Sequence, residues 1–172
     1  WVQTTLDEYD CIHTDMFLHE DLLYRTTCGG ASSRFPTQFI CIARGCKFNC
    51  AYCCGANKNM QALFRRCNIL LRSPEKVAED FIAVEKKNLL WVSTSHDLQM
   101  FGKEYYGKVF AHIRQQNIKP GLYLECFQLP NKDFIDDIVQ TFDVSRTLLA
   151  ISPISGNETL RRENGKLFTN DA

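Results

Sequence analysis

Four short apolar runs alternate along the chain with segments whose apolar residues recur every three or four positions. The apolar runs are Gln38–Ala43, Leu89–Ser93, Leu122–Phe127 and Thr147–Ser152. Each has the length and composition of a buried β-strand. The segments between the runs predict amphipathic helices, with apolar stripes such as Tyr105, Val109 and Ile113.

Capping residues mark the ends of these predicted helices. Ser73-Pro74-Glu75 supplies an N-cap serine, a proline at the first helical position and an acidic residue that the helix dipole favours. Asn131 is the N-cap of a later helix, and Lys119-Pro120-Gly121 ends the helix before it. Strands and helices are therefore expected to alternate from the first apolar run to the last.

Apolar strands separated by helices predict an α/β fold with parallel strands and right-handed crossovers. Four such units are too few for a closed eight-stranded barrel. In barrel-like sheets the chemistry takes place at the carboxyl ends of the strands. Polar residues at those ends are therefore the first candidates for function.

Composition excludes some classes of protein. The 172 residues are 45% hydrophobic and carry no formal net charge, as expected for a globular chain with one core. No apolar run approaches the roughly 20 residues that span a bilayer, and a neutral chain has no overall attraction to nucleic acid. We therefore expect no membrane-spanning segment, and the composition does not indicate a nucleic-acid partner, although it leaves room for a local basic patch.

The most specific motif is a cysteine triplet that directly follows the first predicted strand. Cys46, Cys50 and Cys53 have C-x3-C-x2-C spacing, with Tyr52 before the last cysteine. Three thiolates on one loop can bind three irons of a [4Fe–4S] cluster and leave the fourth iron open to a small molecule. Structural zinc fits poorly because no second pair of ligands follows, and an odd count of nine cysteines does not indicate a disulfide scaffold. A redox pair of Cys50 and Cys53 would leave Cys46 without a role.

This motif resembles the signature of the radical S-adenosylmethionine (radical SAM) superfamily. The resemblance implies that S-adenosylmethionine binds the open iron and that Tyr52 lies beside its adenine. It also implies a partial (β/α)6 TIM-like barrel, of which the chain holds about the first four βα units. Further implications are an external one-electron reductant such as flavodoxin or ferredoxin, and a cytoplasmic location, because the cysteine ligands must stay reduced.

Two acidic residues at strand ends are candidates for binding S-adenosylmethionine. Asp97 follows the second strand, where related proteins often have Gly-Gly-Glu. It either contacts the methionyl amino group or serves as an N-cap in a polar loop. Glu125 ends an otherwise apolar strand, where a buried carboxylate needs a facing cation. The resemblance assigns Glu125 to the methionyl group, and the alternative is a solvated strand end.

The segment after the fourth strand adds further candidates. The resemblance places a ribose-binding residue here, and Ser152 or Ser155 would take that part. Three cations that follow either neutralise a substrate carboxylate or are simply solvated; they are Arg161, Arg162 and Lys166. We expect four other cysteines to be ordinary thiols, Cys11, Cys54, Cys67 and Cys126, although Cys54 is close enough to the triplet for a minor role.

Residues 1–36 do not follow the alternation of strands and helices. We interpret them as a linker from an upstream domain, and residues 37–172 as the radical SAM core, incomplete at its C-terminus. A comparable linker follows a cobalamin-binding domain in cobalamin-dependent radical SAM proteins, which makes cobalamin a candidate third cofactor. His13 and His19 in this segment are expected to be surface residues.

These observations predict an enzyme that cleaves S-adenosylmethionine reductively and so starts radical chemistry on a substrate. The alternative is a non-catalytic iron–sulfur protein for electron transfer or sensing. Such a protein would need a fourth thiolate, and Cys54 is the only nearby candidate in the sequence. No motif in the sequence indicates the substrate or a catalytic residue.

Overall fold

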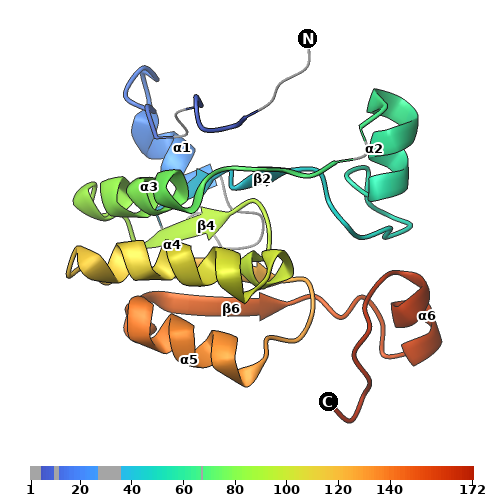
Figure 1. Ribbon diagram of the computed structural model, residues 1–172. Coiled ribbons are helices and arrows are strands. Elements are labelled where there is room, and N and C mark those ends of the chain that lie inside the picture. The colour runs from blue at the N-terminus through green and yellow to red at the C-terminus, as the bar shows by residue number, and fades with distance from the viewer. Residues whose placement is uncertain (1–4, 10–11, 27–35, 67) are drawn as a thin grey trace.

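The main element of the fold is a four-stranded parallel sheet. A computed structural model describes residues 5–9, 12–26, 36–66 and 68–172 (Figure 1). The strand order is β1-β4-β5-β6, so the strands follow one another in sequence. Their bounds are Thr37–Ile40 for β1, Trp91–Thr94 for β4, Leu122–Cys126 for β5 and Thr147–Ile151 for β6. All three neighbouring pairs are parallel, as the sequence predicted.

Three helices connect these strands and cover one face of the sheet (Figure 1). They are α3 (Pro74–Lys86), α4 (Lys103–Gln115) and α5 (Lys132–Thr141). The predicted caps are confirmed, because Ser73 accepts a hydrogen bond from the backbone N–H of Lys76 and Asn131 accepts one from that of Phe134. The apolar stripes of the helices form the core with Ile40, Val92, Leu122 and Leu124 of the strands. Each such fully buried side chain contributes about 1.5–3 kcal/mol.

The other face of the sheet is more open. Register places Phe39, Ser93, Tyr123 and Leu148 in one row across the four strands. Phe39 and Leu148, at the two edges of this row, are 42% and 44% exposed. Helices on one face only are typical of the outside of an α/β barrel, whereas doubly wound sheets have helices on both faces. The α/β prediction is confirmed, and the sheet is compatible with a partial barrel.

The segment before β1 packs against this core. Helix α1 (Glu20–Thr26) lies beside β1, and Ile12 belongs to the hydrophobic core. The Lys87 ammonium group, just after α3, donates to the backbone carbonyl of Ile12, to Glu20 and to the Tyr24 hydroxyl, at 2.9, 3.1 and 2.9 Å. His13 and His19 are exposed, as predicted. The described part of the predicted linker is therefore attached to the core.

The first predicted strand, Gln38–Ala43, is wrong in its extent. Strand β1 ends at Ile40, and the chain then turns into β2 (Ala43–Arg44), which pairs antiparallel with β3 (Leu70–Leu71). The backbone N–H of Ile42 donates to Ser95 Oγ at 3.0 Å, and the carbonyl of Ile42 accepts from Arg72 N at 2.9 Å. These bonds draw the chain out of the main sheet and toward the cysteine loop.

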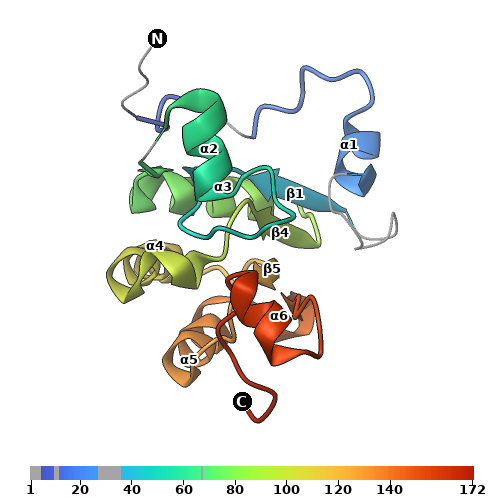
Figure 2. The same cartoon turned by 90° about the vertical axis from the view of Figure 1, so that its right-hand side faces the viewer.

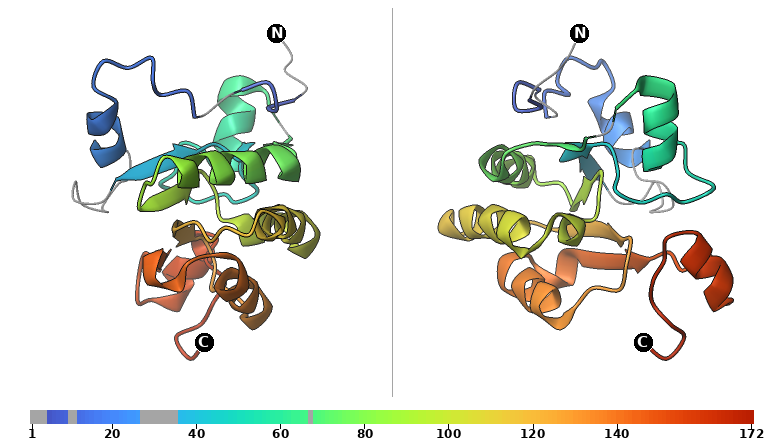
Figure 3. Two further views of the ribbon diagram at one scale, coloured as in Figure 1. Left: turned by 90° about the vertical axis from the view of Figure 1, so that its left-hand side faces the viewer. Right: turned by 45° about the vertical axis from the view of Figure 1, so that its right-hand side comes forward.

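Two helices at the carboxyl side of the sheet flank this loop (Figures 2 and 3). Helix α2 (Asn57–Phe64) follows the cysteines, and α6 (Glu158–Glu163) follows β6. The sequence analysis did not predict α2, whose apolar residues Met60, Leu63 and Phe64 share one side of the helix but are not buried in the core. Within the described residues, no helix has the length and apolar character needed to cross a membrane.

Gly121 is required where the chain enters β5. A Cβ atom at this position would lie 1.9 Å from the backbone oxygen of Leu90 and 3.0 Å from that of Arg146. We expect Gly121→Ala to lower the free energy of unfolding by about 1–3 kcal/mol or more, because strand backbones must move apart. Gly107, inside α4, has open space around it and is the matched control. Gly107→Ala should raise stability by about 0.5–1 kcal/mol. Urea unfolding followed by circular dichroism measures both, and equal stability of the two variants would contradict this account.

Candidate metal centre

The cysteine loop begins at a glycine whose conformation other residues rarely adopt. Gly45 has φ +95°, which turns the chain sharply before Cys46. Two backbone hydrogen bonds then close the loop, from Cys53 N to Cys50 O at 3.2 Å and from Asn57 N to Phe48 O at 2.9 Å. The three cysteines are thus held on one compact turn rather than on an extended segment.

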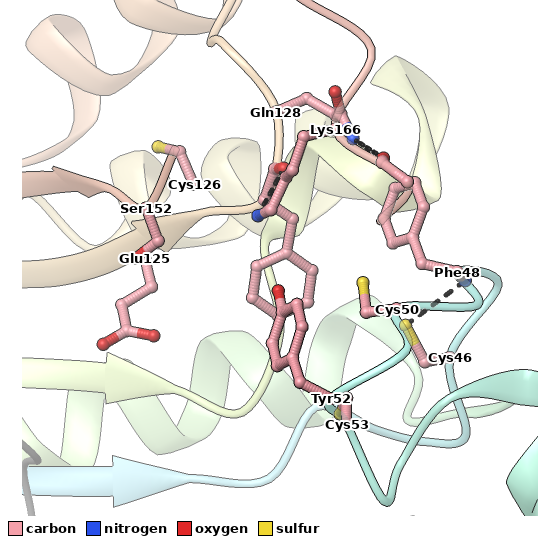
Figure 4. A pocket seen from close by; sticks show the side chains of 12 residues that line it. Cys46, Phe48, Cys50, Tyr52, Cys53, Glu125, Cys126, Gln128, Ser152 and Lys166 are labelled. Atoms are coloured by element: carbon pink, nitrogen blue, oxygen red, sulfur yellow. Dashed lines mark hydrogen bonds between the residues drawn. The ribbon is translucent and has the colours of Figure 1, made fainter. Parts of the chain in front are cut away.

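A cavity of about 290 Å³ lies between this loop and the carboxyl ends of β5 and β6 (Figure 4). Several residues that the sequence singled out line it together: Cys46, Cys50, Cys53, Tyr52, Glu125, Ser152 and Lys166. Phe48, Cys126, Phe127, Gln128 and Gly165 complete the wall. Segments more than 100 residues apart in the sequence therefore meet at one site.

The thiol groups of the loop influence one another. Burial raises the pKa of the Cys46 thiol, the hydrogen bond from Phe48 N–H opposes this, and negative charge on Cys50 or Cys53 raises it further. Burial, a hydrogen bond to Cys50 and the charges of Cys50 and Cys53 raise the pKa of Tyr52 to about 12. Thiolates so close together repel, and a bound cation would remove that repulsion.

Among the described residues, no three Cys, His, Asp or Glu side chains converge closely enough to hold one metal ion. In a [4Fe–4S] cluster each cysteine binds a different iron, so the sulfur atoms need only surround a shared volume. Gly165, with φ +78°, lies on this side, where a Cβ atom would make an ordinary contact of 3.8 Å with Cys50 Sγ.

A chain of hydrogen bonds ties the loop to the end of β4. His96 Nε2 lies 2.9 Å from the carbonyl oxygen of Gly45, which can only accept, so Nε2 carries the proton. His96 Nδ1, 2.8 Å from Ser95 Oγ, then accepts from the Ser95 hydroxyl. Ser95 Oγ in turn accepts from Ile42 N–H at 3.0 Å. The sequence marked this segment only as polar, and nothing in its spacing indicated that His96 positions the cysteine loop.

Asp97 is an N-cap, which confirms one of the two interpretations. Its carboxylate accepts from Gln99 N, at the start of the 3₁₀ helix η1 (Leu98–Phe101), and from Phe127 N, both at 2.9 Å. It is 1% exposed and does not line the cavity. Burial raises the pKa of Asp97, and these hydrogen bonds oppose the rise. Its proposed contact with the methionyl amino group therefore has no support in the geometry.

Glu125 and Ser152 lie at the wall of the cavity, one strand apart. Glu125 is exposed, which agrees with the alternative of a solvated strand end, and within the described residues its carboxylate accepts a hydrogen bond only from the Tyr123 hydroxyl, at 3.3 Å. Ser152 is also exposed. Ser155, the other candidate for the ribose, instead accepts from Asn157 N at 3.0 Å, near the start of α6. Of the two serines, Ser152 is the one that faces a ligand-sized space.

Of the three cations in α6 and just after it, two are buried. Arg161 is 2% exposed and donates to the carbonyl oxygens of Ser155 and Phe168, at 2.9 and 3.3 Å, so its role is structural. Lys166 is 5% exposed, and its ammonium group donates to Phe127 O at 2.8 Å on the wall of the cavity. Arg162 is exposed and points to no described partner. The solvated interpretation is therefore wrong for two of the three cations.

Gln128 fixes the position of Lys166. Its amide donates to Gly165 O at 2.7 Å and accepts from Leu167 N at 3.0 Å, so it binds the backbone on both sides of the lysine. Sequence reasoning did not identify this glutamine. A single amide in an irregular loop has no spacing signal, since its partners are backbone atoms 37 and 39 residues away.

The other cysteines differ in how they lie relative to the cavity. Cys54 is exposed and does not line it. Cys126 does line it, but its side chain and that of Glu125 point to opposite sides of β5 (Figure 4). Burial is the main cause that raises the pKa of the Cys126 thiol to about 12. Cys11 and Cys67 lie outside the described residues.

Comparison with models of protein families, with curated proteins and with solved structures gives no match for this chain. The functional assignment therefore depends on the cysteine motif and on the residues that surround it in space.

The hydrogen-bond chain through His96 predicts a pH dependence of stability. Burial lowers the pKa of His96 from its usual 6.5, although the bond to Gly45 opposes this. As pH falls below about 6.5 the unfolded chain gains a proton that the folded chain does not, so the free energy of unfolding decreases until the folded-state pKa is reached. In the His96→Gln variant, the decrease in the free energy of unfolding that is due to His96 should disappear. The control variant His19→Gln, at an exposed position, should behave like the wild type. Urea unfolding between about pH 7 and pH 5 measures the difference, and equal slopes for wild type and His96→Gln would contradict it.

Proposed function

We propose that this chain is the core of a radical SAM enzyme. One observation carries the proposal: the three motif cysteines share a cavity with Tyr52, Glu125, Ser152 and Lys166 at the carboxyl ends of a parallel sheet. This is the edge at which α/β folds bind ligands and place their chemistry. Chance spacing of cysteines would not by itself bring these polar groups from distant strands to the same place.

Cys46, Cys50 and Cys53 would hold three irons of a [4Fe–4S] cluster. When bound, the cluster and S-adenosylmethionine supply a one-electron cleavage of a carbon–sulfur bond that yields a 5′-deoxyadenosyl radical. The loop residues keep the thiols on one turn, with Cys46 and Cys50 half-buried and Cys53 exposed. Phe48 and Phe127 supply apolar surface to the same wall, which helps to exclude water from a reactive site.

The charges of the cavity match those of an amino acid group. Glu125 offers a carboxylate to an ammonium group, and Lys166 offers an ammonium to a carboxylate, both on the same wall. Lys166 is already oriented by its bond to Phe127 O. We assign Glu125 to the methionyl ammonium of S-adenosylmethionine, Ser152 to the ribose and Tyr52 to the adenine, whose ring it would stack against.

The alternative, an electron-transfer protein with four cysteine ligands, has weaker geometric support. Within the described residues, Cys126 is the only other cysteine that lines the cavity, and its side chain points away from Glu125. Cys54 is exposed and lies next to Cys53 in the chain, so both side chains would have to reach different irons from adjacent positions. The experiments below separate the two functions.

Three cysteines and no others should be needed for the cluster. Anaerobic reconstitution of Cys46→Ala, Cys50→Ala or Cys53→Ala should leave the protein with much less iron and sulfide than the wild type, because each removes one of three ligands. Cys54→Ala and Cys126→Ala are the matched controls and should keep the full content. A full cluster in any of the first three variants, or its loss in Cys54→Ala, would overturn the ligand assignment.

Cleavage of S-adenosylmethionine is the direct test of the function. The full-length protein, reconstituted and chemically reduced without oxygen, should release 5′-deoxyadenosine and methionine even without its substrate. Glu125→Gln should weaken binding of S-adenosylmethionine by about 1–3 kcal/mol, because one partner of a charged hydrogen bond is lost. Glu104→Gln, on the exposed side of α4, is the control. An intact cluster whose spectrum does not respond to S-adenosylmethionine, and that does not cleave it, would favour electron transfer instead.

A further inference from the structure

Helix α2 stands apart from the core, directly after the cysteine loop. None of its residues is buried, and Leu63 and Phe64 at its end are 69% and 61% exposed. Figures 1 and 2 show it projecting beside the loop, on the same side of the molecule as α6. A helix with exposed apolar side chains and little packing of its own has surface available for a partner.

The charge around α2 is strongly one-sided, although the chain as a whole is neutral. From Leu22 to Pro74 the sequence has eight Lys and Arg residues and no Asp or Glu. Four of these cations lie on or beside α2; they are Arg44, Lys58, Arg65 and Arg66. We call these four cations, with Leu63 and Phe64, the basic α2 surface.

The cations of this surface have no carboxylate partners among the residues that the structure describes. On α3, α4 and α5, by contrast, exposed lysines pair with nearby acids, such as Lys76 with Glu79 at 2.7 Å and Lys103 with Asp133 at 2.9 Å. Lysines and arginines on a solvated helix face usually occur with acids in this way. An unpaired set of four beside one helix therefore points to a partner that supplies the negative charge.

The surface also has a concave part next to the cysteines. A second cavity, of about 310 Å³, is lined by Arg44, Gly45, Met60, Phe64 and Arg66. Two guanidinium groups beside a phenylalanine and a methionine can receive a carboxylate together with an apolar side chain. Gly45 precedes Cys46 in the chain, so a partner seated here lies next to the cysteine loop and outside the cavity that Glu125 and Lys166 line.

We propose that the basic α2 surface docks an acidic protein that carries a one-electron redox group, of the flavodoxin or ferredoxin class. The need for an electron rests on the proposed function, because reductive cleavage consumes one electron that no described residue can supply. The donor is oxidised by one electron, the cluster held by the cysteine loop is reduced by one, and no covalent bond changes in this step. The location beside Cys46 keeps the path for the electron short.

A nucleic acid is the less fitting occupant of the same surface. Nucleic-acid-binding domains usually have an excess of positive charge, and this chain has none overall. Arginines next to exposed Leu63 and Phe64 are the composition of a protein interface, in which Arg and aromatic residues are enriched. Weak electron-transfer complexes also bury little area, which suits a site built on one helix.

The first test measures binding, not activity. The probe is an acidic flavodoxin, titrated into the full-length protein with its cluster reconstituted and also without it. Arg65→Gln with Arg66→Gln should raise the dissociation constant about tenfold or more at low salt and should reduce its dependence on ionic strength. The control removes the same charge elsewhere, at the exposed Lys86 and Lys119, and should bind like the wild type. Arg65→Lys with Arg66→Lys keeps the charge and should retain most of the affinity, which separates docking from a folding defect.

The second test separates this proposal from the proposed function. With dithionite as reductant, the Arg65→Gln/Arg66→Gln variant should cleave S-adenosylmethionine as fast as the wild type, whereas with reduced flavodoxin it should be slower. No cleavage with either reductant in the wild type would remove the proposed function, and the binding titration would still decide whether α2 docks an acidic protein. Equal affinity for flavodoxin of Arg65→Gln/Arg66→Gln and of the control Lys86→Gln/Lys119→Gln would overturn the docking site. Tighter binding of a single-stranded RNA than of flavodoxin, lost in Arg65→Gln/Arg66→Gln, would overturn it in favour of nucleic acid.

Discussion

The cysteine loop depends on hydrogen bonds that tie it to the end of β4. The backbone of Ile42 and Gly45, on either side of β2, is bound by Ser95 and His96, which follow β4. Arg72 adds a bond to the carbonyl of Cys41 at 3.2 Å while it forms a buried ion pair with Asp80 of α3. Since β4 is paired in parallel with both β1 and β5, the position of the loop relative to Glu125 is set by the sheet itself. A buried pair such as Arg72–Asp80 adds little net stability but strongly disfavours arrangements that break it.

The elements that periodicity and caps specify were predicted well. Helices α3 and α5 begin where Ser73 and Asn131 cap them, and four apolar runs became four parallel strands in sequence order. Local signals suffice here because each helix buries one stripe against a strand that is adjacent in the chain. The split of the first strand could not be predicted, because it results from a contact between Ile42 and Ser95, 53 residues away.

In the candidate site, too, local sequence signals were predictable and long-range contacts were not. The cysteines and Tyr52 were recognisable because their spacing is local, and strand ends located Glu125 and Ser152. Asp97 has a carboxylate that could bind a ligand, but this carboxylate accepts hydrogen bonds from the backbone N–H groups of Gln99 and Phe127 instead. Lys166 was expected either to neutralise a substrate carboxylate or to be solvated, and it lies buried at the cavity wall, held through Gln128 and Phe127. Residue type gives the chemistry that is available, but only tertiary contacts decide whether backbone groups or a ligand make use of it.

The cysteine loop separates two environments with opposite requirements. On one side, the cavity with Glu125 and Lys166 carries both signs of charge, as the proposed zwitterionic ligand would require. On the other side, Arg44 and Arg66 form a positive, open surface suited to a partner that binds weakly and leaves quickly. A small donor complex at α2 would not have to enter the cavity, so reduction of the cluster would not require the ligand site to open. In this arrangement the three thiols lie at the boundary between the two surfaces, which gives a physical reason for α2 to remain unpacked from the core.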